Sequence, residues 1–112
     1  MTNKNKERGT AFEYRVVEEA KARGFIGDRV PSSGAASGKQ FKDDVIIGIG
    51  DQTWRGECKK TGKYKSIRIQ RETINKLQKN TDFIAFACFR TPVCVVIPFS
   101  RYLNLLKKEA GL

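Results

Sequence analysis

The sequence predicts an α/β domain in which a central mixed β-sheet is flanked by helices. Segments whose apolar residues recur every three or four positions stand near both ends of the chain and once in between, as in amphipathic helices. Short runs rich in Val, Ile and Phe separate them and are typical of strands. At 112 residues the chain suits one modest core, so we expect residues 1–112 to form a single domain, with 1–6 as a flexible basic arm.

The first helix is expected over residues 7–23, with Gly24 as its C-terminal stop. Its apolar side is made by Phe12, Val16, Val17 and Ala20. Glu13 lies beside this apolar side. It either pairs with Lys21 or Arg23 at the surface, or points inward as the neighbour of a metal ion.

Residues 25–30 are expected to form a short strand that ends before Pro31. Residues 31–39 are mostly small and have no apolar period, so they predict a loop. Their Ser hydroxyl and backbone N–H groups, with Arg29, Lys39 and Lys42 nearby, suit contacts to phosphate. An ordinary connection explains the composition equally well.

Two strand-like runs, 45–49 and 53–59, are joined by a short Gly-Asp-Gln turn and predict a hairpin. Side chains alternate along a strand, so Glu57 and Lys59 share a face about 6–7 Å apart. The hairpin can bring Asp44 close to Glu57. Two carboxylates and a lysine can hold a divalent cation and a water. The alternative is a surface ion pair, worth less than about 1 kcal/mol.

The rest of the chain predicts two more helices and three more strands. Residues 64–69 alternate as a strand, 71–79 follow as a helix, and 82–89 form an apolar run typical of a strand covered on both faces. Residues 93–97 return as its neighbour, and Ser100 can cap a last helix. The expected order is therefore α-β-β-β-β-α-β-β-α.

The net charge of +10 indicates a polyanionic partner. The chain contains no histidine, which excludes histidine-dependent hydrolases, so hydrolytic chemistry would depend on carboxylates, lysine and metal. The three cysteines, Cys58, Cys88 and Cys94, are not arranged in C-x-x-C pairs, so structural zinc and disulfides are not expected. We therefore expect a cytoplasmic location, where cysteines stay reduced. No apolar run approaches the roughly 20 residues of a membrane span, and no signal peptide is evident.

Four segments in order resemble a known family. Asp44 followed by Glu-Cys-Lys at 57–59 is similar to the signature of the PD-(D/E)xK nucleases. Residues 8–13 (Arg-Gly-Thr-Ala-Phe-Glu) resemble the opening helix of archaeal-type Holliday junction resolvases, and 29–34 (Arg-Val-Pro-Ser-Ser-Gly) resemble their loop before the aspartate strand. Basic residues within 67–72 resemble the segment after their ExK strand.

The resemblance implies a restriction-endonuclease-like core and an active site. Glu13, Asp44 and Glu57 would surround Mg²⁺, with Mn²⁺ as a substitute, and Lys59 would position or activate the attacking water. Ser33 would touch the scissile phosphate or complete the site. Asp43 stands where the family has proline, and either aspartate could be the ligand. Asp44 is preferred because the apolar strand starts directly after it.

The implied activity is a structure-specific endonuclease that resolves four-way DNA junctions by paired symmetric cuts. Two cuts related by a two-fold axis require two sites, so a homodimer is expected. Backbone phosphates would supply affinity through basic residues: Arg8, Arg29, Lys39, Lys42, Lys60, Lys63, Arg68 and Arg71. The alternatives are another PD-(D/E)xK endonuclease acting on duplex or flapped DNA, and a non-catalytic module that binds branched DNA.

Overall fold

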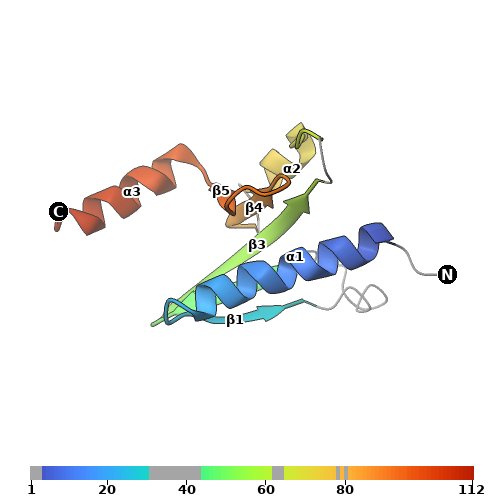
Figure 1. The fold of residues 1–112 in the computed structure, drawn as a ribbon. Coiled ribbons are helices and arrows are strands. Elements are labelled where there is room, and N and C mark those ends of the chain that lie inside the picture. The colour runs from blue at the N-terminus through green and yellow to red at the C-terminus, as the bar shows by residue number, and fades with distance from the viewer. Residues whose placement is uncertain (1–3, 31–43, 62–64, 78, 80) are drawn as a thin grey trace.

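The computed structural model describes residues 4–30, 44–61, 65–77, 79 and 81–112, and for residues 4–8 it describes the backbone alone. Helices flank a five-stranded sheet (Figure 1). The elements follow in the order α1 (Lys4–Lys21), β1 (Ile26–Arg29), β2 (Val45–Ile49), β3 (Gln52–Lys60), α2 (Arg71–Lys76), β4 (Phe83–Ala87), β5 (Cys94–Val96) and α3 (Phe99–Glu109).

The sheet is mixed, as the sequence predicts. Its strand order is β1-β2-β3-β4-β5. β1 pairs antiparallel with β2, β2 with β3 and β4 with β5, whereas β3 and β4 are parallel. A parallel pair needs a crossover connection, and the segment that contains α2 supplies it. The tight turn between β2 and β3 contains Gly50, whose φ of 59° is easily adopted by glycine.

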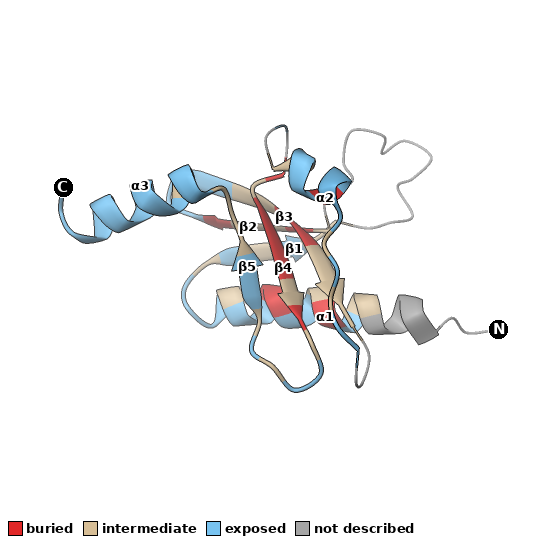
Figure 2. Cartoon of the chain, turned by 90° about the horizontal axis from the view of Figure 1, so that it is seen from above, coloured by how far each residue is buried: buried red, intermediate tan, exposed pale blue. Residues whose placement is uncertain are grey.

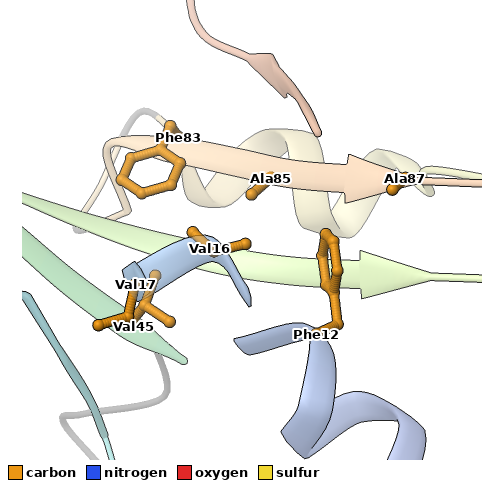
Figure 3. Packing of buried hydrophobic residues seen from close by; sticks show 7 residues of the cluster. All are labelled: Phe12, Val16, Val17, Val45, Phe83, Ala85 and Ala87. Atoms are coloured by element: carbon orange, nitrogen blue, oxygen red, sulfur yellow. The ribbon is translucent and has the colours of Figure 1, made fainter. Parts of the chain in front are cut away.

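The hydrophobic core lies between α1 and one face of the sheet. Figure 3 shows side chains from α1 meeting side chains from β2 and β4, and the cluster consists of Phe12, Val16, Val17, Val45, Phe83, Ala85 and Ala87. The predicted apolar side of the first helix is therefore the side that is buried. Gly56 on β3 lies directly against the Phe83 ring, where a Cβ atom would overlap ring carbons.

Side chains of β3 divide between the two faces of the sheet. Trp54 and Cys58 pack against the core on the α1 side. Because side chains alternate along a strand, Glu57 and Lys59 project from the opposite face. This is the face that the end of α2 reaches, since Lys76 bonds to Glu57. The hairpin thus separates its apolar residues from its charged ones.

The strand expected over residues 64–69 is wrong. Residues 65–70 have neither helical nor strand structure, and the residue before them lies outside the described part of the chain. An alternating pattern makes a strand only where it can pair with the edge of another strand. The strand that precedes this segment, β3, offers no edge, because β2 and β4 occupy both of its sides. The observed order is therefore α-β-β-β-α-β-β-α.

Helix boundaries also differ from those expected. α1 begins at Lys4 and takes in residues expected to belong to the basic arm. α2 ends at Lys76, and the N–H of Leu77 turns back to the carbonyl oxygen of Ile74. Ser100 does not cap α3, because the helix begins at Phe99 and Pro98 holds the cap position without a side-chain hydrogen bond. Proline is tolerated there because the cap position needs no backbone N–H donor to the helix.

α3 projects away from the rest of the molecule. In Figure 1 it extends from the end of β5, and Figure 2 shows most of its length as exposed. None of its residues is buried. Among the helices of the described residues, none combines the length and the apolar composition that a membrane span requires.

Candidate active site

The register of the hairpin brings Asp44 opposite Glu57. Val45 pairs with Gly56 in the antiparallel ladder, so one step further along each strand places these two carboxylates side by side on one face. The Asp44 N–H donates to the carbonyl oxygen of Gly56 at 2.9 Å. Its Oδ2 accepts from the N–H of Cys58 at 2.8 Å. The Asp44 carboxylate is therefore held against β3 by the backbone.

Glu57 is a buried carboxylate with one oxygen satisfied. The residue is 7% exposed. The Lys76 ammonium at the end of α2 donates to Oε1 at 2.8 Å. The other oxygen, Oε2, is buried and has no hydrogen-bond partner among the residues that the structure describes. A buried carboxylate oxygen without a donor is costly, and a bound cation would relieve that cost.

Glu13 on α1 is held from β1. The Arg29 Nε–H donates to Glu13 Oε1 at 3.0 Å, and the guanidinium also lies 4.8 Å from the centre of the Tyr14 ring. The hydrogen bond to Glu13 raises the pKa of the Arg29 guanidinium, which stays protonated. Glu13 does not pair with Lys21 or Arg23. Lys21 forms an ion pair with Glu18, and Arg23 forms one with Glu19, in each case about one helical turn earlier in the chain.

The site concentrates negative charge. The pKa of the Asp44 carboxyl is raised to about 6. Burial is the main cause, and the charges of Glu13 and Glu57 add to it, while the hydrogen bond from Cys58 and the charge of Lys59 act in the opposite direction. Burial likewise raises the pKa of the Cys58 thiol, with help from the charge of Asp44, so that this group stays neutral. Mutual repulsion of this kind is relieved by a cation.

The donor chemistry fits a hard divalent ion. Carboxylate oxygens are what Mg²⁺ prefers, and it usually takes only one or two from protein and the rest from water and phosphate. In the part of the chain that the structure describes, no three His, Cys, Asp or Glu side chains form a ready-made metal cluster. Asp44 and Glu57 across the hairpin are the two carboxylates closest to this donor chemistry, and the charge of Glu13 raises the pKa of the Asp44 carboxyl.

Other residues chosen from the sequence are scattered. Lys59 is half-buried, and its positive charge lowers the pKa of the Asp44 carboxyl. Lys60 lies on the α1 face, with Nζ 5.9 Å from the centre of the Phe12 ring. Arg68 and Arg71 are exposed around the start of α2. The remaining candidates, or their side chains, lie outside the described residues: Arg8, Ser33, Lys39, Lys42, Asp43 and Lys63.

Sequence reasoning missed Lys76. Its contact joins α2 to β3 across 19 positions in the chain, and it is one of 22 Lys and Arg residues. Nothing in its local sequence distinguishes it from the other basic residues. The one available signal was a lysine in the last turn of the helix that follows the ExK strand. Its contact with Glu57 can be recognised only when the path of the chain from β3 through α2 to β4 is known.

An Asp-Glu pair and a lysine on a hairpin of a mixed sheet define the class of PD-(D/E)xK nucleases. The family model "Archaeal holliday junction resolvase (hjc)" matches residues 4–91, and the chain belongs to this family. It is a nuclease of the Holliday junction resolvase class, as the motifs in the sequence predict.

The fold is also that of a solved structure. The structure of Hjc from Archaeoglobus fulgidus, a Holliday junction resolvase from an archaeal hyperthermophile, superposes with a TM-score of 0.60 and 18% identity, over 80% of this chain and 75% of that one. At that identity the similarity establishes the restriction-endonuclease-like fold. A search of curated proteins found no match. The family match ends before β5 and α3.

Proposed function

We propose that this resolvase is a divalent-metal-dependent endonuclease that uses Mg²⁺, with Mn²⁺ as a substitute, to hydrolyse two symmetric phosphodiester bonds in a four-way DNA junction. One observation carries the metal dependence: the buried, unpartnered Oε2 of Glu57 beside the Asp44 carboxyl.

Each residue has a distinct part in this proposal. Asp44 and Glu57 hold the metal, with Glu13 completing the acidic surroundings. The metal supplies an activated water and positive charge against the phosphate oxygens. Lys59, on the same face of β3 as Glu57, positions that water or donates to the scissile phosphate. Ser33 is proposed to contact that phosphate.

DNA binding is proposed to rest on backbone phosphates. The charge of +10 favours a polyanion, and phosphate contacts with Lys and Arg give a steep dependence on salt with little readout of base sequence. Of the proposed contacts, Lys60, Arg68 and Arg71 lie around the ends of β3 and α2, close in sequence to the acidic pair. Arg29 is bonded to Glu13 and would have to divide its donors between that carboxylate and phosphate.

A labelled four-way junction and a linear duplex of the same sequence test the substrate and the metal together. We expect paired nicks near the branch point only in the junction and only with Mg²⁺ or Mn²⁺. Cleavage that continues in EDTA would overturn the metal dependence. Equal cleavage of the linear duplex would instead favour a PD-(D/E)xK nuclease of another specificity.

Asp44→Asn and Glu57→Gln test the ligand pair. Each should slow cleavage by at least about 100-fold, the order expected when one electrostatic group of an active site is removed. Both variants should still bind the junction in EDTA, because the phosphate contacts remain. Asp51→Asn, which removes an exposed carboxylate from the turn of the same hairpin, is the matched control and should cut normally. Normal cutting by Asp44→Asn or Glu57→Gln would show that the metal lies elsewhere.

A homodimer formed through α3 is the assembly we propose. Apolar side chains follow one another at three- and four-residue intervals along this helix and are exposed: Phe99, Tyr102, Leu103 and Leu106. α3 is attached to the body by its other side, where Arg101 bonds Asp82 at 2.7 Å and lies 3.7 Å from the centre of the Trp54 ring. The apolar stripe therefore faces away from its own chain.

A second copy is the occupant that best suits this stripe. An apolar surface does not bind phosphate. The basic residues in the last turn of α3, Lys107 and Lys108, follow the stripe, and Arg101 lies on the other side of the helix. Two-fold pairing of identical stripes would bury them on both chains. It would also give the two related sites that symmetric cleavage needs.

A further inference from the structure

Lys76 is the residue outside the known motifs that touches the acidic site most closely. It occupies the last turn of α2, and its ammonium lies 2.8 Å from Glu57 Oε1. The Glu57 side chain is 10% exposed and the Lys76 side chain 39%. The ammonium therefore approaches from the more open side while the carboxylate stays buried.

The backbone of Lys76 is fixed independently of this ion pair. Its carbonyl oxygen accepts from the N–H of Lys79 at 3.0 Å and from the N–H of Thr81 at 3.1 Å. Thr81 is buried. Thr73, which lies in α2 about one turn before Lys76, is buried as well. The end of the helix is thus anchored to the body of the protein, and the ammonium is delivered from a rigid support.

We propose that Lys76 is a positioning residue that fixes the Glu57 carboxylate and directs Oε2 toward the metal. The division of the two oxygens carries this inference. Lys76 occupies Oε1, whereas Oε2 is buried and meets no hydrogen-bond partner in the described part of the chain. Without the ammonium, Glu57 would be an uncompensated buried charge that would take up a proton or turn toward solvent. The inference depends on the metal site of the proposed function.

The alternative is that Lys76 occupies the position of the metal and leaves when the metal binds. That arrangement would place the ammonium on the oxygen that the metal needs. The observed contact is to the other oxygen, so both cations can bind Glu57 at once. The two arrangements predict opposite effects. Removing a supporting lysine weakens metal binding, whereas removing a competing lysine strengthens it.

Measuring Mn²⁺ binding in the absence of DNA distinguishes a supporting lysine from a competing one. Free Mn²⁺ is measured by electron paramagnetic resonance as it is titrated into the unsubstituted protein, Lys76→Met, Lys76→Arg and Lys79→Met. We expect Lys76→Met to weaken Mn²⁺ binding about tenfold or more, as is usual when the partner of a metal ligand is removed. Lys76→Arg should recover most of the loss. Lys79→Met, an exposed lysine just after α2, should bind normally.

Unchanged or tighter Mn²⁺ binding by Lys76→Met would overturn the inference. If the unsubstituted protein binds no Mn²⁺, the metal site and this inference fall together, whereas normal binding that Lys76→Met leaves unaltered overturns the inference alone. Junction binding in EDTA is the second readout. It should be the same for Lys76→Met and Lys79→Met, and a selective loss in Lys76→Met would identify a DNA contact instead.

Folding is checked by thermal unfolding in EDTA. Should Lys76→Met fail to fold, Lys76→Gln keeps a neutral donor of shorter reach at the same position, and its Mn²⁺ affinity decides by the same criterion. A positioning role requires weaker Mn²⁺ binding in a folded variant, with recovery by arginine.

Discussion

Asp44, Glu57 and Glu13 each give one oxygen to a protein donor, and the donors come from different parts of the fold. The N–H of Cys58 holds Asp44, the ammonium of Lys76 holds Glu57 and the guanidinium of Arg29 holds Glu13. These bonds set the orientation of each carboxylate before any metal binds. Pre-oriented ligands lose little conformational freedom on binding, which favours a tight site.

The raised pKa of Asp44 makes a prediction about stability. Its pKa is about 6 in the folded protein against 3.8 for an unperturbed aspartate, mainly because of burial. The folded state therefore holds this proton more tightly than the unfolded state does, and the associated stability is present below the unfolded pKa and is lost as pH rises through the folded value. In EDTA, Asp44→Asn should raise the unfolding temperature at neutral pH and have a smaller effect near pH 4.

Thermal unfolding of the two proteins across this pH range measures the difference. Asp51→Asn is again the control, because its carboxylate is exposed. Added Mn²⁺ should reverse the order, since it stabilises the native protein and not the variant that lacks the ligand. A variant less stable than the native protein at neutral pH in EDTA would show that the Asp44 carboxylate stabilises the metal-free fold.

At the scale of single residues, the sequence predicts which site residues lie together when they belong to the same hairpin. Asp44, Glu57 and Lys59 lie on one hairpin, and strand alternation alone brings them to one face. Lys76 and the Glu13–Arg29 pair depend on how α2 and β1 are placed against other elements. Local periodicity contains no information about that placement, so the donors that hold the carboxylates were not predicted.

Among the elements, the hairpin of β2 and β3 was predicted well because a turn and two runs of strand-forming residues specify it locally. The strand expected over 64–69 failed because strand formation also needs a free edge, and β2 and β4 occupy both edges of β3. The edge partner of a strand is a property of the whole sheet. An alternating pattern of side chains cannot report it.

The contact between β3 and β4 gives a prediction for Gly56. Its Cα faces the ring of Phe83, so Gly56→Ala would overlap the ring and should destabilise the protein by about 1–3 kcal/mol, as overpacking of a core does. Chemical denaturation measures this free energy of unfolding. Gly9→Ala is the matched control, since a Cβ at Gly9 in α1 meets nothing within 4 Å. Alanine there should be neutral or stabilising because it lies within a helix.

A second substitution tests the cause. Phe83→Leu removes ring atoms at the point of overlap, so in the Gly56→Ala background it should cost less stability than it does alone. Equal costs in both backgrounds would show that Gly56 is needed for another reason. Because Glu57 follows Gly56 directly, Gly56→Ala should also weaken Mn²⁺ binding, which links the core of the sheet to the acidic site.

At the scale of the whole molecule, α3 leaves the body of the protein. Figure 1 shows the helix extending from β5 without covering the sheet. Its exposed apolar residues are unusual for a surface helix, since a helix with an apolar stripe normally buries it. The sequence predicted the helix and its leucines. It could not indicate that Arg101 anchors the opposite side to Asp82 and Trp54.

Leu106→Glu tests whether α3 joins two copies. Leu106 is the last residue of the stripe and is 41% exposed in the single chain, so a glutamate there is tolerated in a monomer but not in an apolar interface. We expect the native protein to sediment as a dimer and Leu106→Glu as a monomer in analytical ultracentrifugation. Asn104→Glu, which adds the same charge to the other side of α3, should remain dimeric.

The monomeric variant should still bind Mn²⁺, because its acidic site is intact, but it should nick junctions on one strand at a time. Paired symmetric cuts by a monomer, or a dimer unaffected by Leu106→Glu, would show that the two-fold axis runs through another surface.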